Sequence, residues 1–350
     1  MRKKVVKLID YVFQHHFQLT EAYDDSNSMR YLSDEFDIEI IGRFIQNKIT
    51  EHRVKGPSTD YKVTFLPKSF SIQAVVDYIL KLNPNVIHMH GNHGWPQYPI
   101  YASAFVNKGI KLIFSPAGAS CGTHEFLECF DTVIVNHVEQ IKRMRCPPAK
   151  VLVRHRGADP SVFYPVPGGK KKYNFVYVAG FVPQKRLDFM IECVKNTPYN
   201  MVILGDFTRL TEHYILIRDI IKLQRLENKI FLHDFIPQTQ MSQFLGQCKV
   251  WVWPNIKPEN PETTTNRSII EALGCGMPLL VGERAFKNSH FLITGINGYS
   301  YSTKEEFQEK ANLIMEDYLS FGKNSVILGR VKFSFQENFI DFYKNCYNSS

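Results

Sequence analysis

The chain lacks several features that would assign it quickly to a class of protein. Its 350 residues contain no apolar run close to the ~18 residues that a membrane-spanning helix needs. The basic N-terminus has an apolar run that is broken by Lys7 and Asp10, and no small-residue cleavage site follows it, so we predict no signal peptide. The seven cysteines lie between Cys121 and Cys346 without a CxxC pair. This pattern favours free thiols in a reducing cytoplasm over a disulfide framework or a zinc knuckle.

Two phosphate-binding motifs are also missing. The sequence contains neither GxGxxG nor GxxxxGK[ST], so the dehydrogenase and P-loop interpretations lose their main support. The length is about twice the ~150 residues that are usual for one domain, which favours two domains of similar size.

Short runs rich in Val and Ile alternate with segments of helical periodicity along the whole chain, which is typical of layered α/β domains with parallel sheets. We expect strands in the first half at residues 4–10, 36–42, 61–67, 85–90, 110–116 and 131–136. We expect strands in the second half at residues 173–180, 200–206, 229–235, 249–255 and 278–283. Helices are expected between them, for example at residues 71–84, 186–196 and 266–276.

Two successive sets of this kind predict two Rossmann-like domains. The boundary falls near FYPVPGGKKK, where prolines and glycines are typical of a linker, so we expect domains at residues 1–165 and 166–325. Residues 326–350 are expected to form a C-terminal helix. Its amphipathic stretch SFQENFIDFYKNCY either closes the second core or packs back toward the N-terminal domain.

The formal charge of +8 is concentrated in the middle of the chain. Nine basic residues lie between Lys142 and Lys172 against the single acid Asp159. Such a segment is either a solvated face or a surface for a phosphate-rich partner, such as a nucleotide, a lipid head group or nucleic acid.

Ligands of parallel α/β sheets bind beyond the carboxyl ends of the strands, and diphosphates favour helix N-termini there. Lys185 follows the expected strand 173–180, where a cation can neutralise a departing diphosphate. Residues Thr263 to Ser268 precede the helix SIIEALGC, so their amides are expected to face an anion, with Thr265 or Asn266 as the N-cap.

Four stretches together resemble the retaining GT-B glycosyltransferases of family four, also known as glycosyl transferases group 1. AGFVPQKRLDFMIECV resembles the first strand-turn-helix of their nucleotide-binding domain, and PETTTNRSIIEALGCGMPLLVG resembles their Glu-x7-Glu region. NPNVIHMHG and VLVRHRGADPSVFYP resemble a strand of the first domain and the crossover. The resemblance covers roughly residues 80 to 300, in the family's order and spacing. It implies two Rossmann-like domains facing each other across a cleft.

The resemblance also implies roles for residues. It implies that Lys185, His90 and Glu262 carry catalysis, and that Glu271 accepts hydrogen bonds from the donor ribose. The donor-binding residues that it implies are Gly180, Arg186, Thr263, Thr264, Asn266, Arg267, Ser268, Glu271 and Arg156. The residues that it implies on the acceptor side are His93, Trp95, Ala117 and Gly118.

The sequence departs from the family pattern at three positions. Gly180 stands where the family usually has an arginine, and Thr263 stands where it has the first glutamate, so that Glu262 is one position out of register. Ala117 stands where the family has a histidine. In the family these positions touch the donor phosphate, the donor sugar and a distal sugar hydroxyl. Arg154 or Arg156 of the crossover is expected to supply a compensating cation.

Three histidines occur within NVIHMHG and the residues that follow it. Zinc would need three or four ligands in a tetrahedral arrangement, and no cysteine or carboxylate cluster accompanies His88, His90 and His93, so we predict no metal. We expect His90 and His93 to line the acceptor side, where they bond hydroxyls or share a proton. His88 is expected inside the sheet. Trp95 and Tyr98 suit either stacking against a sugar ring or a base, or packing in a core.

The resemblance therefore implies a hexosyl- or pentosyltransferase that uses a nucleotide diphosphate sugar, UDP rather than GDP, with retention and with no cofactor. The acceptor is expected to be a glycan or glycolipid. The location is expected to be cytoplasmic, with a basic face against an anionic membrane as one arrangement. Two alternatives stay open: glycosylation of a modified base in DNA, and a sugar-nucleotide-binding protein without activity.

Overall fold

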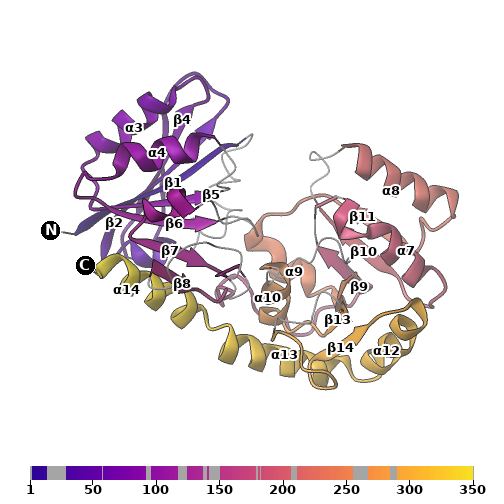
Figure 1. The fold of residues 1–350 in the computed structure, drawn as a ribbon. Coiled ribbons are helices and arrows are strands. Elements are labelled where there is room, and N and C mark those ends of the chain that lie inside the picture. Colours follow the sequence, from indigo (N-terminus) through magenta and orange to yellow (C-terminus); the bar gives the residue numbers. More distant parts are fainter. Residues whose placement is uncertain are drawn as a thin grey trace. The chain divides into compact units, whose positions relative to one another are not determined.

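The computed structural model describes residues 2–13, 29–56, 58–91, 96–116, 124–136, 140–141, 150–178, 180–181, 183–205, 211–254, 267–283 and 290–349. At residues 11–13, 124, 184 and 211 it describes the backbone alone. The chain divides into two compact units, one of residues 1–155 with 336–350 and the other of residues 156–335 (Figure 1). The boundary expected at residue 165 therefore falls within the second unit.

The first unit contains an eight-stranded sheet among its described residues. In spatial order its strands are β3 (Thr50–Val54), β4 (Tyr61–Pro67), β2 (Phe36–Phe44), β1 (Lys3–Phe13), β5 (Val86–Gly91), β6 (Lys111–Pro116), β7 (Thr132–Val135) and β8 (Val151–Val153). Neighbouring strands are parallel, except that β3 runs antiparallel to β4. The helical segments are η1 (Met29–Leu32), α3 (Ile72–Lys81), α4 (Gln97–Phe105), α5 (His124–Glu128), η5 (Gln336–Asp341) and α14 (Phe342–Asn348).

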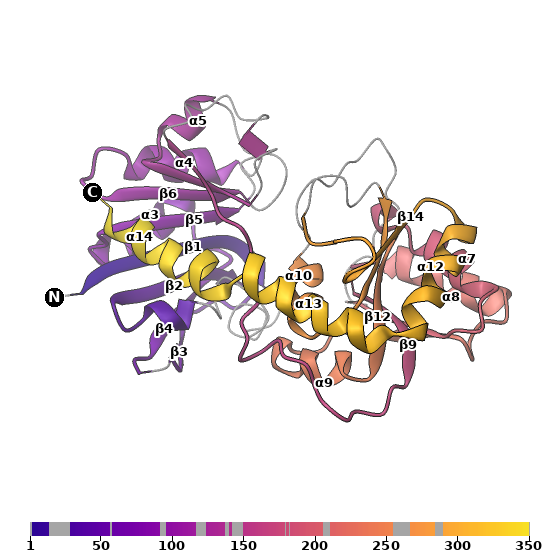
Figure 2. The ribbon, with the colours of Figure 1, turned by 90° about the horizontal axis from the view of Figure 1, so that it is seen from below.

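Successive side chains of the central strands point to opposite faces of this sheet, and both faces are covered by other elements. Val6 and Leu8 of β1 belong to the core cluster that includes α3 and α4. Lys7, between them, points to the other face, because successive side chains of a strand alternate. There its ammonium lies 5.6 Å from the ring centroid of Tyr343 in α14. Figures 1 and 2 show α3 and α4 on one face of the sheet and α14 on the other.

The C-terminal segment is bound to the first unit by a buried polar cluster. His88 is fully buried, with Nδ1 2.8 Å from Tyr347 Oη and Nε2 2.7 Å from Ser115 Oγ. Arg154 donates from Nη1 to Tyr343 Oη at 2.8 Å. Residues 336–349 thus complete the first core, and the expectation that this stretch closes the second core is wrong.

The second unit contains a six-stranded parallel sheet among its described residues. In spatial order its strands are β11 (Ile230–His233), β10 (Met201–Leu204), β9 (Tyr173–Val178), β12 (Cys248–Trp253), β13 (Leu279–Gly282) and β14 (Gly298–Tyr301). Its helical segments are η3 (Pro183–Lys185), α7 (Leu187–Lys195), α8 (Thr211–Leu223), η4 (Gln238–Gln240), α9 (Met241–Leu245), α10 (Arg267–Gly274), α12 (Lys304–Glu316) and α13 (Tyr318–Lys332). The predicted fold class of two parallel α/β domains is confirmed.

The strand orders place one topological switch point in each sheet. In the first unit the chain moves outward from β1 to β2 in one direction and from β5 to β6 in the other. In the second unit the same divergence occurs between β9 and β12. Ligands of open α/β sheets bind at the carboxyl ends of such neighbouring strands. A ligand site is therefore expected at the carboxyl ends of β1, β5, β9 and β12.

Candidate functional site

In the second unit, the turn after β9 carries two cations. Lys185 ends η3, and its carbonyl accepts a hydrogen bond from Tyr177 Oη at 3.1 Å. The Lys185 ammonium lies 4.8 Å from the ring centroid of Trp253, the last residue of β12. The side chain is therefore half-buried at the switch point and does not extend into solvent, as it would in a merely surface turn.

Arg186 follows directly and adopts a left-handed backbone conformation, with φ 47° and ψ 45°. Its Nε lies 3.2 Å from a carboxylate oxygen of Asp188, and its guanidinium carbon lies 5.6 Å from the ring centroid of Phe189. A non-glycine residue with positive φ is uncommon, and such residues concentrate at functional sites. Gly180, at the end of the same strand, has open space where a side chain would begin.

Helix α10 brings further polar groups to this edge. Ser268 in its first turn donates from Oγ to the carbonyl of Val178 at 3.3 Å, which joins the helix to the end of β9. Arg267 Nε donates to Glu271 Oε1 at 2.6 Å, across one helical turn. Glu271 is 9% exposed, so it is not an ordinary surface carboxylate. A buried carboxylate paired in this way is positioned to accept hydrogen bonds from a ligand hydroxyl.

In the first unit, the switch point carries a carboxyl group that the sequence analysis missed. Asp10 lies near the end of β1 and is 4% exposed. Tyr101 Oη donates to its Oδ2 at 2.8 Å, and Arg43 Nε lies 3.5 Å from its Oδ1. Burial raises the pKa of the Asp10 carboxyl, although the bond from Tyr101 and the charge of Arg43 act in the opposite direction. The sequence signal that could have indicated Asp10 as a site residue was its position as a charged residue at the end of an apolar strand.

His90 and Asp10 are connected through Tyr98. The hydroxyl of Tyr98 donates to the His90 carbonyl at 2.6 Å and accepts from the Asp10 backbone N–H at 3.2 Å. His90 is half-buried at the carboxyl end of β5, which pairs in parallel with β1, the strand that carries Asp10. Tyr98 itself is fully buried, so it is a core residue, and the alternative of stacking against a sugar ring or base is wrong.

The two crossover arginines have different surroundings. Arg154 is 6% exposed, and it donates from Nη1 to Tyr343 and from Nη2 to Asn136 at 3.2 Å. Its guanidinium therefore stabilises the packing of the first unit and is not the expected compensating cation. Arg156 belongs to the second unit and is half-buried.

The remaining expected site residues lie outside the described residues. They are Glu262, Thr263, Thr264, Thr265, Asn266, His93, Trp95, Ala117 and Gly118.

Metal ligation and thiol chemistry would rest on the His, Cys, Asp and Glu side chains of the described part of the chain. It holds no group of three or more His, Cys, Asp or Glu side chains that could bind a metal ion. Burial raises the pKa of the Cys275 thiol to about 12, and the same cause raises the pKa of Cys248 to about 12, so neither forms a nucleophilic thiolate near neutral pH. No helix in the described ranges is long and apolar enough to cross a bilayer.

Comparisons with known proteins agree with this arrangement. A family model described as Glycosyl transferases group 1 matches residues 165–326. An uncharacterized glycosyltransferase of Methanocaldococcus jannaschii is 22% identical over 218 residues, which are 61% of this chain and 53% of that protein. The chain thus spans about half the length of this curated relative.

Solved structures resemble the whole chain. Sucrose-phosphate synthase from Thermosynechococcus elongatus superposes with a TM-score of 0.76 at 13% identity, covering 100% of both chains. Anabaena HepE in complex with UDP and glucose gives a TM-score of 0.71 at 13% identity, covering 99% of this chain and 100% of that one. These likenesses establish the GT-B fold.

Proposed function

We propose that this protein transfers a sugar from a nucleotide diphosphate sugar to a hydroxyl acceptor, because a family model described as Glycosyl transferases group 1 matches residues 165–326. The observation that carries the proposal is the carboxyl edge of β9 and β12, where the Lys185 ammonium lies 4.8 Å from the Trp253 ring centroid and Ser268 of α10 bonds the Val178 carbonyl. Two cations beside a helix N-terminus suit a diphosphate, both when the donor binds and when it departs.

In this proposal Lys185 and Arg186 stabilise the negative charge that develops on the leaving diphosphate. Glu271 accepts hydrogen bonds from the ribose hydroxyls, and Arg267 orients it through the 2.6 Å contact between Nε and Oε1. Ser268, Gly180, Arg156 and the unplaced residues Thr263, Thr264 and Asn266 complete the donor site. The donor is a UDP-sugar, a choice supported by the UDP held in the similar HepE structure.

The first unit binds the acceptor in this proposal. His90 and Asp10 lie at its switch point and offer groups that bond a hydroxyl, together with His93, Trp95, Ala117 and Gly118. The acceptor is a glycan or glycolipid, and transfer retains the anomeric configuration. The second unit alone then stabilises the leaving group, with Glu262 as a further catalytic residue, and no resident metal or cofactor takes part.

The decisive experiment is a screen of nucleotide sugars for UDP or GDP release and for mass addition to glycan and lipid acceptors. NMR of the product gives the anomeric configuration. Lys185→Ala should lower turnover by on the order of 10²- to 10³-fold, as expected when one preorganised electrostatic contact is lost. Lys222→Ala, at an exposed lysine of α8, is the matched control. Equal losses in both variants, or no release and no transfer with any donor, would overturn the proposal.

Glu271 has its own test. Glu271→Gln keeps the shape of the side chain and removes its charge, so UDP affinity should fall by ~1–3 kcal/mol if a charge-assisted hydrogen bond to the ribose is lost. Calorimetry with UDP and with UMP measures this loss. Unchanged affinity for both nucleotides would remove Glu271 from the site.

A further inference from the structure

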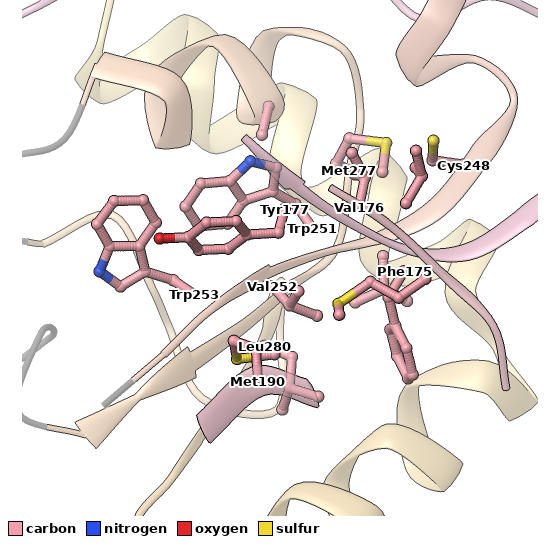
Figure 3. Close-up of a cluster of buried hydrophobic side chains, with 14 of the residues drawn as sticks. Phe175, Val176, Tyr177, Met190, Cys248, Trp251, Val252, Trp253, Met277 and Leu280 are labelled. Atoms are coloured by element: carbon pink, nitrogen blue, oxygen red, sulfur yellow. The ribbon is translucent and has the colours of Figure 1, made fainter. Parts of the chain in front are cut away.

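Stacked aromatic side chains contact both the backbone carbonyl and the ammonium of Lys185. We call this group of Tyr177, Trp251 and Trp253 the aromatic block. Trp251 and Trp253 lie two residues apart on β12, so their side chains share a face of the strand. Their rings stack with centroids 5.4 Å apart and an interplanar angle of 6°. The ring of Tyr177, on the neighbouring β9, stacks on Trp253 at 5.5 Å and 30°. Figure 3 shows these three rings grouped on one side of the strands, with Val252 on the other.

The indole of Trp253 has little freedom to move. It is 2% exposed, and its backbone carbonyl accepts a hydrogen bond from Tyr301 Oη at 2.8 Å. Tyr177, which packs on this indole, also donates a hydrogen bond from its hydroxyl to the Lys185 carbonyl. The backbone of Lys185 and the surface under its ammonium are therefore fixed by the same aromatic block.

A lysine side chain is otherwise a flexible stem that ends in a strongly hydrated charge. A cation within about 6 Å of an indole centroid is attracted by the ring, most strongly where water is excluded. The 4.8 Å distance between the Lys185 ammonium and the Trp253 ring meets this condition. The buried indole of Trp253 at the end of a central strand gives the lysine a rigid, apolar support that an aliphatic residue would not provide.

We propose that Trp253 is a positioning residue that holds the Lys185 ammonium at the donor edge of the second unit. The proposal rests on the proposed function, because it takes Lys185 as the cation for the leaving diphosphate. Trp253 acts through Lys185 and touches no reacting atom. Its contribution is to keep the ammonium in one place before the donor binds, so that turnover does not include the cost of ordering the side chain.

The contact itself can be tested without any substrate. In protein labelled with ¹³C-lysine, the ε-methylene protons of Lys185 should be shifted upfield by the indole ring current, with Lys185→Arg giving the assignment. The shift should shrink in Trp253→Phe and disappear in Trp253→Leu. It should persist in Trp251→Phe, the matched control, because the ring under the Lys185 ammonium is that of Trp253. An unshifted Lys185 resonance in the wild-type protein would overturn the proposal, whatever the enzyme does.

The functional consequence is read from a double-mutant cycle. Loss of one partly desolvated cation–π contact predicts a fall in kcat/KM of roughly fivefold to thirtyfold in Trp253→Leu, with a smaller fall in Trp253→Phe. In the Lys185→Met background the same substitutions should have no further effect, which a purely structural role for the tryptophan would not produce. Trp251→Phe, compared at equal thermal stability, should keep wild-type kcat/KM.

The outcomes separate the two proposals. A shifted lysine resonance with equal kcat/KM in Trp253→Leu and wild type would overturn the positioning role and leave the transferase function standing. Additive losses in the cycle would do the same, because Trp253 would then act independently of Lys185. The absence of transfer from every donor would overturn the transferase function, and the positioning role with it, while the resonance still reported the contact.

Discussion

Arg186 offers a test that separates backbone strain from ligand binding. Its left-handed conformation is fixed on both sides, because its N–H donates to the Pro183 carbonyl at 3.1 Å and its carbonyl accepts from Met190 at 3.2 Å. The left-handed region costs an L-residue about 1–2 kcal/mol and costs glycine almost nothing. Substituting Arg186 with Ala keeps this strain, whereas substituting it with Gly removes it.

The expected difference in stability between the Gly and Ala variants follows from two opposing effects. Glycine relieves ~1–2 kcal/mol of strain but gains about 0.4–1 kcal/mol of conformational freedom in the unfolded chain. Arg186→Gly should therefore be more stable than Arg186→Ala by roughly 0.5–1 kcal/mol. The contacts of the wild-type side chain with Asp188 and Phe189 contribute only about 0.5–1 kcal/mol each at partly exposed positions, so the Gly variant should stay within ~1 kcal/mol of the wild type.

The assays are urea unfolding for stability and calorimetry with UDP for the site. If the guanidinium binds the diphosphate, both variants should lose at least about tenfold in UDP affinity, since a charge-assisted contact is worth ~1.5–3 kcal/mol. Arg225 provides the control, because it is also a left-handed arginine of the second unit, with φ 55°. It follows α8 and precedes β11, at the amino end of the sheet. Arg225→Ala and Arg225→Gly should show the same difference in stability with unchanged UDP affinity.

Equal stability of the Ala and Gly variants at position 186 would refute the strain argument. Wild-type UDP affinity in Arg186→Gly would instead remove Arg186 from the donor site, and the left-handed turn would then need another explanation.

Three further outcomes are expected. Tyr347→Phe removes the hydroxyl that bonds His88 Nδ1 and should lower the free energy of unfolding by ~1–3 kcal/mol, measured in urea, whereas a change within error would show that the buried cluster contributes nothing. The raised pKa of Asp10 means that its contribution to stability is present below its unfolded pKa and is lost as the pH rises through the folded pKa. Urea titrations should therefore show that Asp10→Asn gains stability relative to wild type as the pH rises above the unfolded pKa of about 4, and a difference independent of pH would contradict this. Transfer activity should survive prolonged treatment with EDTA, and loss of turnover that zinc restores would revive a metal site at the histidines.

The fold was predictable because both sheets are built from buried parallel strands. Such strands read as continuous apolar runs with helices between them, and every strand expected from these runs is confirmed. The missed strands lack this signal. β3 is the polar segment TEHRV, paired at an edge and antiparallel, while β8 has three residues and β14 is GYSY. Edge strands bury less surface, so their sequences carry less of the pattern.

The site was only partly predictable. Lys185 was predicted from its place after a strand and Glu271 from the family resemblance, because both signals depend on local order along the chain. The support of Lys185 by Trp253 joins residues that are far apart in sequence but meet because β9 and β12 are neighbours. The bond between Tyr101 and Asp10 is non-local in the same way. A sequence shows which residues end strands, but it does not show which strands lie side by side.

The two switch points carry different charges, and this difference agrees with a division of labour in group transfer. At the edge of the second unit lie the two cations Lys185 and Arg186, which suit the phosphate-bearing donor of the proposed function, and the carboxylate of Glu271 is kept close to Arg267. At the edge of the first unit the buried Asp10 is bound by Tyr101 and Arg43, beside His90, and no comparable pair of cations meets there among the described residues. An acceptor hydroxyl needs hydrogen-bond acceptors and donors, whereas a leaving diphosphate needs positive charge. In the proposed function, the same topology, used twice, presents each substrate with the chemistry that it requires, and an exchange of charge at either edge should abolish transfer while leaving both sheets intact.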